Sequence, residues 1–550
     1  MTRDGSTERT PAWNGWTREP GPPLSVAVRR ELHRLLGLPP GLRTPSVPRD
    51  EVRLPESALP AAVLRQLESA IGADRVRTGR DERIAHAAGR SYLDLVRLRA
   101  GDADAAPDAV VHPADADQIR SVLAICAAAD VAVVPFGGGT SVVGGVAGER
   151  GGHRAALTLD LDDLDQLVDV DPTSQTATLQ AGMRGPAVES ALATHGFTLG
   201  HFPQSYQYAT VGGWVATRSA GQASTGYGRI DDLVHGLVCV TPTGDLRLGR
   251  GPASAAGPRL LDLVVGSEGT LGIITEATLA VRPVPAARRY AGWSLPDLPA
   301  GLAACRALAQ RLGPGLAPDV CRLSDPDETH TTMLLAGGSL STRLGRGYLA
   351  LRGHRAGCLL ILGWEGDADS LRYRQHAATR LLRAHGGVTL GAAPGRSWLH
   401  GRFDGPKLRD RLLEHGMLVE TLETAADWSA LPALYDAIRD SLRGSLGRVL
   451  VLTHVSHLYR TGASLYVTVL AVRDGADPVG QWSAAKQAVT KAITAHAGTV
   501  THHHAVGADH RAFLEGEIGA TGVELLRAAK SAVDPSGILN PGKLIPDRPS

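Results

Sequence analysis

The sequence lacks the cysteine pattern of a disulfide-bonded or zinc-stabilised protein. Its cysteines are odd in number, and no two of them form a C-x-x-C pair: Cys126, Cys239, Cys305, Cys321 and Cys358. Neither a disulfide framework nor a structural zinc site is therefore expected, and a reducing compartment is favoured.

Long apolar runs and an excess of one charge are also missing. The longest apolar run, at residues 121–136, is interrupted by Asp130, and it is shorter than the ~20 residues that cross a bilayer as a helix. The 57 basic and 56 acidic residues leave a net charge of +1, which gives no electrostatic reason to bind nucleic acid. The polar start of the chain does not resemble a secretory signal. We expect a cytoplasmic protein without a transmembrane segment, and peripheral contact with the inner face of a membrane stays compatible with the sequence.

Helical and strand periodicities alternate along the chain and predict an α+β fold. Strands are predicted at residues 110–111 and 131–136, with a helix between them that Asp115 caps. Residues 167–170 and 176–179 flank a turn and predict a hairpin. Further strands are predicted at 155–161, 237–242, 246–248, 273–281, 449–452 and 465–472, and further helices at 26–36, 186–195 and 523–533.

A glycine-rich segment follows the strand predicted at residues 131–136. It reads PFGGGTSVVGG over residues 135–145, and successive N–H groups in such a loop form an anion-binding nest. It lacks the Gly-Lys-Ser/Thr of a Walker A loop, and Val142 replaces the last glycine of a dinucleotide fingerprint. Taken alone, the segment indicates a ligand-binding loop and a turn without a ligand about equally well.

Two further glycine-rich segments decide between these interpretations. They read TVGGWVATRSAG at residues 210–221 and VGSEGTLGIIT at residues 265–275. In order and spacing, the three segments resemble the flavin domain of the vanillyl-alcohol-oxidase superfamily, over residues 106–285. The resemblance implies a two-subdomain fold that binds FAD. Because the first segment contains neither His nor Cys, non-covalent FAD is expected.

The resemblance also implies which residues contact the cofactor. The first segment would hold the pyrophosphate of FAD, and the other two would line the rest of the cofactor. The implied set is Pro135, Phe136, Gly137, Gly138, Gly139, Thr140 and Ser141, then Gln204, Ser205, Thr210, Gly213, Thr217, Arg218, Ser219 and Ala220, and finally Glu268, Gly269, Thr270, Leu271, Gly272, Ile273 and Ile274.

Within this superfamily, the chain resembles the alkyl-dihydroxyacetonephosphate synthase family. The resemblance is carried by GHFPQSYQYAT at residues 200–210, WNGW at 13–16 and THHHAVG at 501–507, which is similar to the Ser-His-His-His-Gly-Val-Gly of that family. Ala505 replaces a glycine of that motif, and Gln204 stands where the family usually has Asp. These departures leave the fold in place and the lipid substrate open.

The resemblance suggests five parts of the chain. The expected order is an irregular N-terminal extension, a helical region, the FAD-binding domain, an α+β substrate domain, and a C-terminal histidine loop with a helical segment. Their predicted bounds are 1–50, 51–105, 106–285, 286–500 and 501–550. The two tryptophans near the start of the chain, Trp13 and Trp16, are expected to pack onto a domain surface.

The activity that the resemblance implies is a redox-neutral transfer in ether-lipid synthesis. That reaction exchanges the acyl group of acyl-dihydroxyacetone phosphate for a fatty alcohol. Tyr466 matches the proton-transferring tyrosine of the family, Arg409 a substrate-binding arginine, and Arg322 another functional arginine. The expected partners are a phosphorylated, lipid-like substrate, a fatty alcohol and a second copy of the chain in a homodimer.

Each of these residues also has a plain structural interpretation. Tyr466 suits half-buried packing on a strand, Arg409 a helix surface, and Arg322 a structural ion pair. His502, His503 and His504 are expected on an extended segment, where alternation sends His502 and His504 to one face and His503 to the other.

A second candidate activity is that of an FAD-dependent D-2-hydroxyacid dehydrogenase or oxidase. Some of these enzymes use a His-bound divalent metal, and His454 and His457 would offer ligands. No acidic ligand stands at a convincing spacing, so no metal is predicted. A third possibility is a flavoprotein that has adapted the same scaffold to another anionic substrate.

Overall fold

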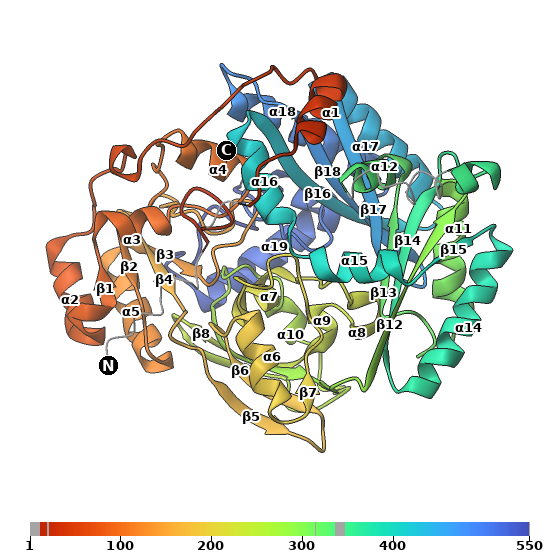
Figure 1. Cartoon of the computed structure of the whole chain (residues 1–550). Helices are drawn as coiled ribbons and strands as arrows, with labels where there is room; N and C mark the ends of the chain where they lie inside the picture. Colours follow the sequence, from red (N-terminus) through yellow and green to blue (C-terminus); the bar gives the residue numbers. More distant parts are fainter. Residues whose placement is uncertain (1–10, 19–20, 314, 336–346, 549–550) are drawn as a thin grey trace.

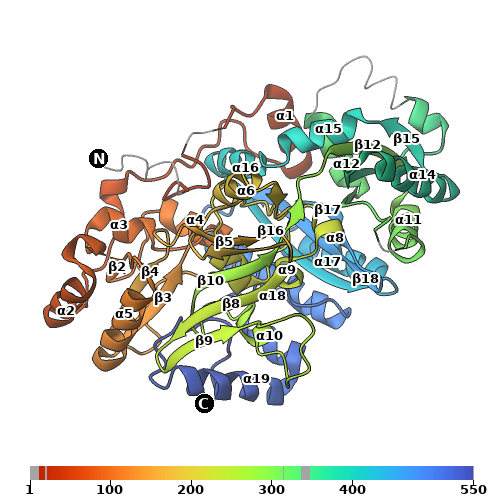
Figure 2. The same cartoon turned by 90° about the horizontal axis from the view of Figure 1, so that it is seen from below.

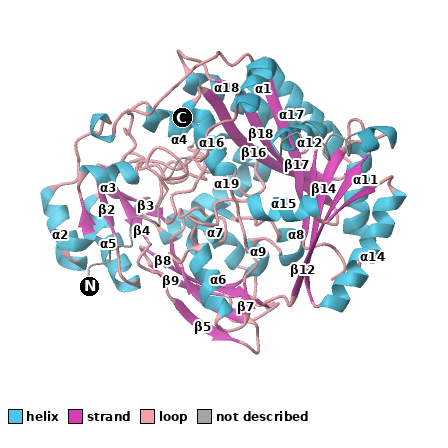
Figure 3. Ribbon diagram, viewed as in Figure 1, coloured by secondary structure: helices cyan, strands magenta, loops and turns pink. Residues whose placement is uncertain are grey.

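The computed structural model describes residues 11–18, 21–313, 315–335 and 347–548, and it has the predicted α+β fold. Three larger sheets and their covering helices surround a loop-rich centre, as Figures 1 and 3 show. Among the described residues, no helix combines the length and the apolar character that crossing a bilayer requires. The five cysteines are buried and unpaired.

The N-terminal region packs against two of the three larger sheets. Helix α1 begins after the capping Ser25 and packs Leu32 and Leu36 against apolar residues of the largest sheet. The Trp16 residue is 7% exposed within a hydrophobic core, and its backbone N–H donates to Asp410, so Trp16 packs against the rest of the molecule as predicted. The elements are α1 (Val26–Leu36), η2 (Arg49–Glu51), α2 (Ala61–Ile71), η3 (Ala73–Arg75), α3 (Arg80–Ala85) and α4 (Tyr92–Arg99).

The first sheet carries the glycine-rich loop at the end of its edge strand. Its order is β1-β2-β4-β3, with β2, β4 and β3 parallel. The strands are β1 (Val76–Arg77), β2 (Ala109–Val111), β3 (Val131–Phe136) and β4 (Ala155–Asp160), and α5 (Ala116–Ala129) packs on them. The β2-α5-β3 unit and its Asp115 cap are confirmed, whereas β1 and short 3-10 turns interrupt the helical region predicted at 51–105.

The second sheet is antiparallel, with the order β5-β6-β10-β8-β9. The predicted hairpin is present as β5 and β6. Its strands are β5 (Leu167–Asp171), β6 (Thr176–Gln180), β8 (Val234–Thr241), β9 (Gly244–Leu248) and β10 (Ile273–Ala280). Around it lie α6 (Gly185–Ala193), α7 (Val211–Thr217), α8 (Ser224–Tyr227), α9 (Ile230–Leu233), α10 (Leu261–Val264) and the small pair β7 (Phe197–Thr198) and β11 (Arg282–Pro283).

The third sheet is antiparallel and has seven strands in the order β15-β12-β14-β13-β17-β18-β16. They are β12 (Ala287–Leu295), β13 (Val320–Ser324), β14 (Cys358–Gly366), β15 (Val388–Gly391), β16 (Met417–Asp427), β17 (Val449–Leu458) and β18 (Gly462–Val472). The accompanying helices are α11 (Leu298–Arg311), α12 (Pro326–Leu335), α14 (Ala368–Ala384), α15 (Ala393–Gly401), α16 (Gly405–Glu414), α17 (Leu431–Leu446) and α18 (Pro478–Ala495).

The C-terminal segment returns to the first two sheets. After η4 (Arg511–Phe513), helix α19 (Leu514–Val533) runs below β8 and β9 in Figure 2. The N–H of Val133 in β3 then donates to the carbonyl of Ile538, and the N–H of Asn540 donates to the carbonyl of Val133. The chain end thus braces the strand from which the glycine-rich loop leaves.

Candidate functional site

The glycine-rich loop offers a run of free amide donors. Within the described part of the chain, no group accepts a hydrogen bond from the N–H of Gly138, Gly139 or Thr140. The loop packs so closely that a Cβ on Gly138 would lie 2.1 Å from the carbonyl oxygen of Tyr208. Gly139 has φ +63°. An amide nest that only glycine can form fits the pyrophosphate of FAD.

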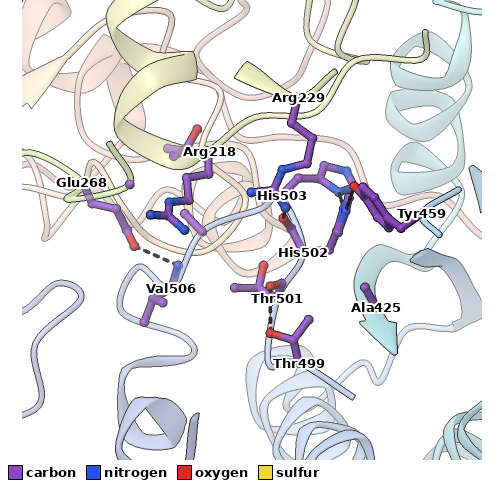
Figure 4. Close-up of a pocket in the computed structure, with 13 residues that line it drawn as sticks. Arg218, Arg229, Glu268, Ala425, Tyr459, Thr499, Thr501, His502, His503 and Val506 are labelled. Carbon is purple, nitrogen blue, oxygen red and sulfur yellow. Dashed lines mark hydrogen bonds between the residues drawn. The ribbon is translucent and has the colours of Figure 1, made fainter. Parts of the chain in front are cut away.

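A cavity of about 390 Å³ lies between the flavin-binding segments and the third sheet. Figure 4 shows Arg218 and Glu268 on one side of it and His502, His503 and Tyr459 on the other. Its lining is completed by Thr217, Arg229, Gly266, Ala425, Thr499, Thr501, Ala505 and Val506. The volume lies within the range of small-molecule sites.

Glu268 joins the flavin segments to the histidine loop. Its carboxylate accepts hydrogen bonds of 2.8 Å from the N–H groups of Val506 and Gly507. Burial raises the pKa of Glu268 to about 7, although these two donors act in the opposite direction. Its φ of +53°, like the +52° of Arg218, is unusual for a residue with a side chain and marks a bend that the surrounding contacts enforce.

A row of polar side chains crosses three adjacent strands of the third sheet. Tyr466 on β18 lies opposite His454 on β17 and opposite Glu423 on β16. The rings of Tyr466 and His454 stack with centroids 4.9 Å apart. Tyr466 therefore lies on a strand as predicted, and it also meets the histidine loop, 6.0 Å from the ring of His503 and 5.7 Å from that of His504.

Glu423 shapes the histidine loop. Its two carboxylate oxygens accept the N–H groups of His502, His503 and His504 and the hydroxyl of Thr501. The segment is bent and not extended, so the predicted alternation of faces is wrong. Three consecutive N–H groups can reach one carboxylate only if the backbone curls around it, and the three rings then pack together, with centroids 5.1 Å and 4.8 Å apart.

Three imidazoles of this cluster, those of His457, His502 and His504, favour their neutral forms. Burial lowers the pKa of His504 to about 3 and holds the pKa values of His457 and His502 well below the usual range. Burial also penalises the charge of Glu423, but His502, His503 and His504 together outweigh this and hold the pKa of Glu423 well below its usual range. The cluster thus combines a buried carboxylate with three rings that resist protonation and take part in hydrogen bonds as neutral groups.

Arg322 reaches the same row from β13. Its guanidinium donates to Nε2 of His454 at 2.7 Å and to Oε1 of Glu328 at 2.7 Å. Burial disfavours the Glu328 charge, but Arg322 and His454 lower its pKa to about 2. Arg322 is thus ion-paired and also connected through His454 to Tyr466.

Arg409 is buried, and the helix-surface interpretation is wrong. Its side chain on α16 is 9% exposed and pairs with Glu420 of β16 at 3.0 Å. Glu420 also accepts the N–H of Thr421. Nε of Arg409 has no acceptor among the described residues, so part of its donor fork stays available.

The other predicted flavin contacts do not line this cavity and occupy different structural settings. Phe136, Ile273 and Ile274 are buried in strands or at their ends, where Phe136 packs against Gly139. Gln204 donates to the carbonyl of Arg402. Thr210 caps α7 through its bond from Gly213. The remaining predicted contacts, Ser205, Ser219, Ala220 and Gly269 to Gly272, lie in the turns that join these elements.

Three histidines could also hold a metal ion. One potential ligand atom from each of His457, His502 and His503 lies within 4.8 Å of the others. However, Nε2 of His502 is already 2.6 Å from the hydroxyl of Tyr459, and its Nδ1 is 2.9 Å from Nδ1 of His503. The absence of a metal stays a prediction.

The sequence analysis missed four residues that shape this site. Glu420 and Glu423 are carboxylates on the otherwise apolar strand β16, and that pattern was the available signal because buried carboxylates need partners. Arg229 donates to the carbonyl of His502, and Tyr459 contacts its ring. No local pattern distinguishes either of these two residues.

Comparisons with known proteins agree with this geometry. Residues 107–249 match the family described as FAD binding domain, and residues 284–544 match FAD linked oxidases, C-terminal domain. The chain is similar to alkyldihydroxyacetonephosphate synthase of Dictyostelium discoideum, with 32% identity over 88% of this chain and 80% of the relative. It is also 27% identical to the glycolate oxidase subunit GlcD of Bacillus subtilis, over 80% of this chain and 89% of that protein. A solved alkyldihydroxyacetonephosphate synthase superposes with a TM-score of 0.83 at 27% identity, covering 98% of this chain and 99% of the other.

Proposed function

Because the chain belongs to the family of FAD-linked oxidases that includes alkyldihydroxyacetonephosphate synthases, we propose that it is a redox-neutral transferase. It exchanges the acyl group of acyl-dihydroxyacetone phosphate for a fatty alcohol. FAD is bound without a covalent link and supplies an electron-accepting ring beside the reacting carbon. The residues of the chain supply proton transfer and charge.

The observation that carries this proposal is the contact of Tyr466 with His503 and His504 beside the flavin segments. Such a reaction must remove a proton from the alcohol, and it must also transfer the proton of the substrate carbon. Burial raises the pKa of Tyr466, so its phenol keeps its proton and can donate it as a general acid. His503 and His504 are the rings in contact with it.

The two arginines fit the anionic groups of the substrate. Arg322 carries a guanidinium next to His454 and can face the leaving carboxylate. Arg409 retains a free Nε and can face the phosphate, with Glu420 fixing its orientation. Guanidinium groups suit both anions because they donate two parallel hydrogen bonds.

The direct test is a product analysis. The purified protein is mixed with acyl-dihydroxyacetone phosphate and an isotopically labelled fatty alcohol, and the lipids are examined by mass spectrometry. The proposal expects a labelled ether and an equal amount of free fatty acid. Absence of labelled ether, with a D-2-hydroxyacid oxidised instead, contradicts it.

The flavin linkage has its own test. Acid denaturation is expected to release all FAD into the supernatant, because residues 135–141 contain neither His nor Cys. Yellow precipitated protein would contradict non-covalent binding.

A second candidate is an FAD-dependent D-2-hydroxyacid dehydrogenase or oxidase. The similarity to a glycolate oxidase subunit favours it, as does the group of His457, His502 and His503, which could hold a metal. The product analysis separates the two candidates, since only the transferase consumes the alcohol.

A further inference from the structure

Arg90 lies in the turn between α3 and α4, directly against the glycine-rich loop. The backbone N–H of Arg90 donates to the carbonyl of Ser141 at 2.6 Å. A Cβ on the preceding Gly89 would lie 2.3 Å from that same oxygen. The Arg90 residue is 3% exposed. The backbone of this turn is therefore in fixed contact with the loop that carries the amide nest.

The guanidinium of Arg90 has few partners. Its Nη1 donates to the carbonyls of Ala88 and Gly89, the two residues before it. Its Nε is buried without an acceptor, and Nη2 donates to no residue that the structure describes. No carboxylate in the described ranges forms an ion pair with it, although Asp94 and Asp410 lie near enough for their charges to act on the pKa of Arg90 in the upward direction.

Two other buried arginines show what a purely structural role looks like in this protein. Arg83 donates from Nε to Pro107 and from Nη2 to Pro55, which joins separate segments. Arg99 also joins separate segments, because its Nη1 donates to the carbonyl of Asn14 and its Nη2 to the carbonyl of Thr44. Arg90 joins nothing beyond its own turn through its side chain, so tying segments together does not explain its burial.

The buried charge of Arg90 is costly unless something compensates it. Burial lowers the pKa of Arg90 to about 10, with Asp94 offsetting part of this effect, so the group stays cationic at neutral pH. A buried cation without an ion-paired partner is strongly unfavourable. The free amides of Gly138, Gly139 and Thr140 lie on the loop that Arg90 contacts, and they also lack acceptors.

We propose that Arg90 binds a phosphate group of a ligand that occupies the glycine-rich loop. The anion is either the pyrophosphate of FAD or the phosphate of the substrate, and only the second case rests on the proposed function. In both cases the free nitrogens of the guanidinium and the loop amides share one anionic group.

The first arm of the test measures FAD binding to the full-length apoprotein by flavin fluorescence. Arg90→Gln removes the charge, and Arg90→Lys keeps it without the planar fork. The matched control is Arg83→Gln, a buried arginine in the neighbouring helix that bonds only to carbonyls. If Arg90 holds the pyrophosphate, Arg90→Gln weakens FAD binding about tenfold to hundredfold, Arg90→Lys weakens it less, and the control binds like wild type.

The second arm titrates the FAD-loaded protein with inorganic phosphate in a calorimeter. If Arg90 holds the substrate phosphate, Arg90→Gln weakens phosphate binding by a similar factor while FAD binding is unchanged. Neither measurement needs ether-lipid turnover, so failure of the proposed function leaves both readable. Should Arg90→Gln not fold by circular dichroism, Arg90→Lys carries both arms. Wild-type affinity for FAD and for phosphate in the folded Arg90 variants overturns the proposal.

Discussion

Two groups of buried histidines in this molecule face opposite electrostatic situations. Beneath the flavin loop, His86 and His112 share two carboxylates, Glu82 and Asp160, with His86 only 2.8 Å from Asp160. Beside the cavity, three rings, His502, His503 and His504, surround the single carboxylate Glu423, and His457 stacks on His502.

The number of carboxylates per ring separates the two groups. Burial disfavours a charged imidazole in both. For His86, Asp160 and Glu82 together outweigh burial and raise its pKa, and for His112 the hydrogen bond of Glu82 and the charges of Asp160 and Glu82 do the same. For His502 and His504 burial prevails and their pKa values fall.

The comparison shows that burial alone does not decide what a histidine does. In the pair under the flavin loop the carboxylates favour the charged form of the rings, and His86 packs against Phe136 with ring centroids 4.5 Å apart, which supports the loop. In the cluster at the cavity, burial favours the neutral forms of His457, His502 and His504, which then take part in hydrogen bonds as neutral rings.

The largest effect is expected from replacing Glu423, the carboxylate that holds the histidine loop. In Glu423→Gln, the amide cannot accept hydrogen bonds from three N–H groups and a hydroxyl together. We expect turnover to fall about 10³-fold or more, since several proton-transfer groups are displaced at once, and the free energy of unfolding to fall by roughly 3 kcal/mol. Labelled-ether formation and urea unfolding measure the two effects. Near-wild-type turnover would mean that Glu423 only fills space.

The next effect is loss of single proton-transfer groups. Tyr466→Phe and His504→Ala should each lower turnover by about 10²–10⁴-fold while FAD binding stays intact. Tyr373→Phe is the control, because that side chain is exposed on α14. A Tyr466→Phe enzyme that turns over like the Tyr373→Phe control would assign Tyr466 to packing alone.

A smaller effect is expected at the buried ion pair. Arg409→Lys keeps a positive charge for Glu420 but loses the fork that would face a phosphate. We expect apparent substrate binding to weaken by about 1.5–3 kcal/mol, measured as the change in KM for the acyl substrate. An unchanged KM, together with lower thermal stability, would show that Arg409 is only half of a structural pair.

The smallest effect is the pH dependence of stability, which sharpens the comparison directly. The stabilisation from His86, whose pKa is raised, is complete below the unfolded pKa of about 6.5 and is lost as pH rises through the folded pKa. His504 acts in the opposite direction: its contribution is complete above about 6.5 and is lost as pH falls toward about 3.

The free energy of unfolding, measured with urea between pH 5 and 9, should therefore depend on pH to a different extent in the variants. His86→Gln is expected to flatten the decline on the alkaline side, because the variant lacks the group whose pKa is raised. Parallel curves for His86→Gln and wild type would contradict a charged His86.

Much of the fold could be predicted from local patterns. Strand β3 and helix α1 have the predicted bounds, because a short apolar run and a capped amphipathic helix are local signals. Strand β17 was predicted only over 449–452, whereas it continues to Leu458. His454 and His457 interrupt the apolar pattern there, and only the neighbouring strands reveal that these polar side chains are buried.

The site was predicted less completely, for a physical reason. The residue types of the histidine loop and Tyr466 were identified from their motifs, and the structure places them in contact. The curl of the loop depends on Glu423, which is 79 residues away from His502 in sequence. Long-range hydrogen bonds of this kind leave no periodicity in either segment.

The central claim is that turnover needs no electron acceptor, and anaerobic turnover tests it most directly. Enzyme, acyl-dihydroxyacetone phosphate and a fatty alcohol are mixed without oxygen or dye, and the flavin spectrum is followed while product is counted. The account predicts many turnovers with the flavin returning to its oxidised spectrum. A single reduction of the flavin that stops until oxygen or a dye is added would contradict it and favour a D-2-hydroxyacid dehydrogenase.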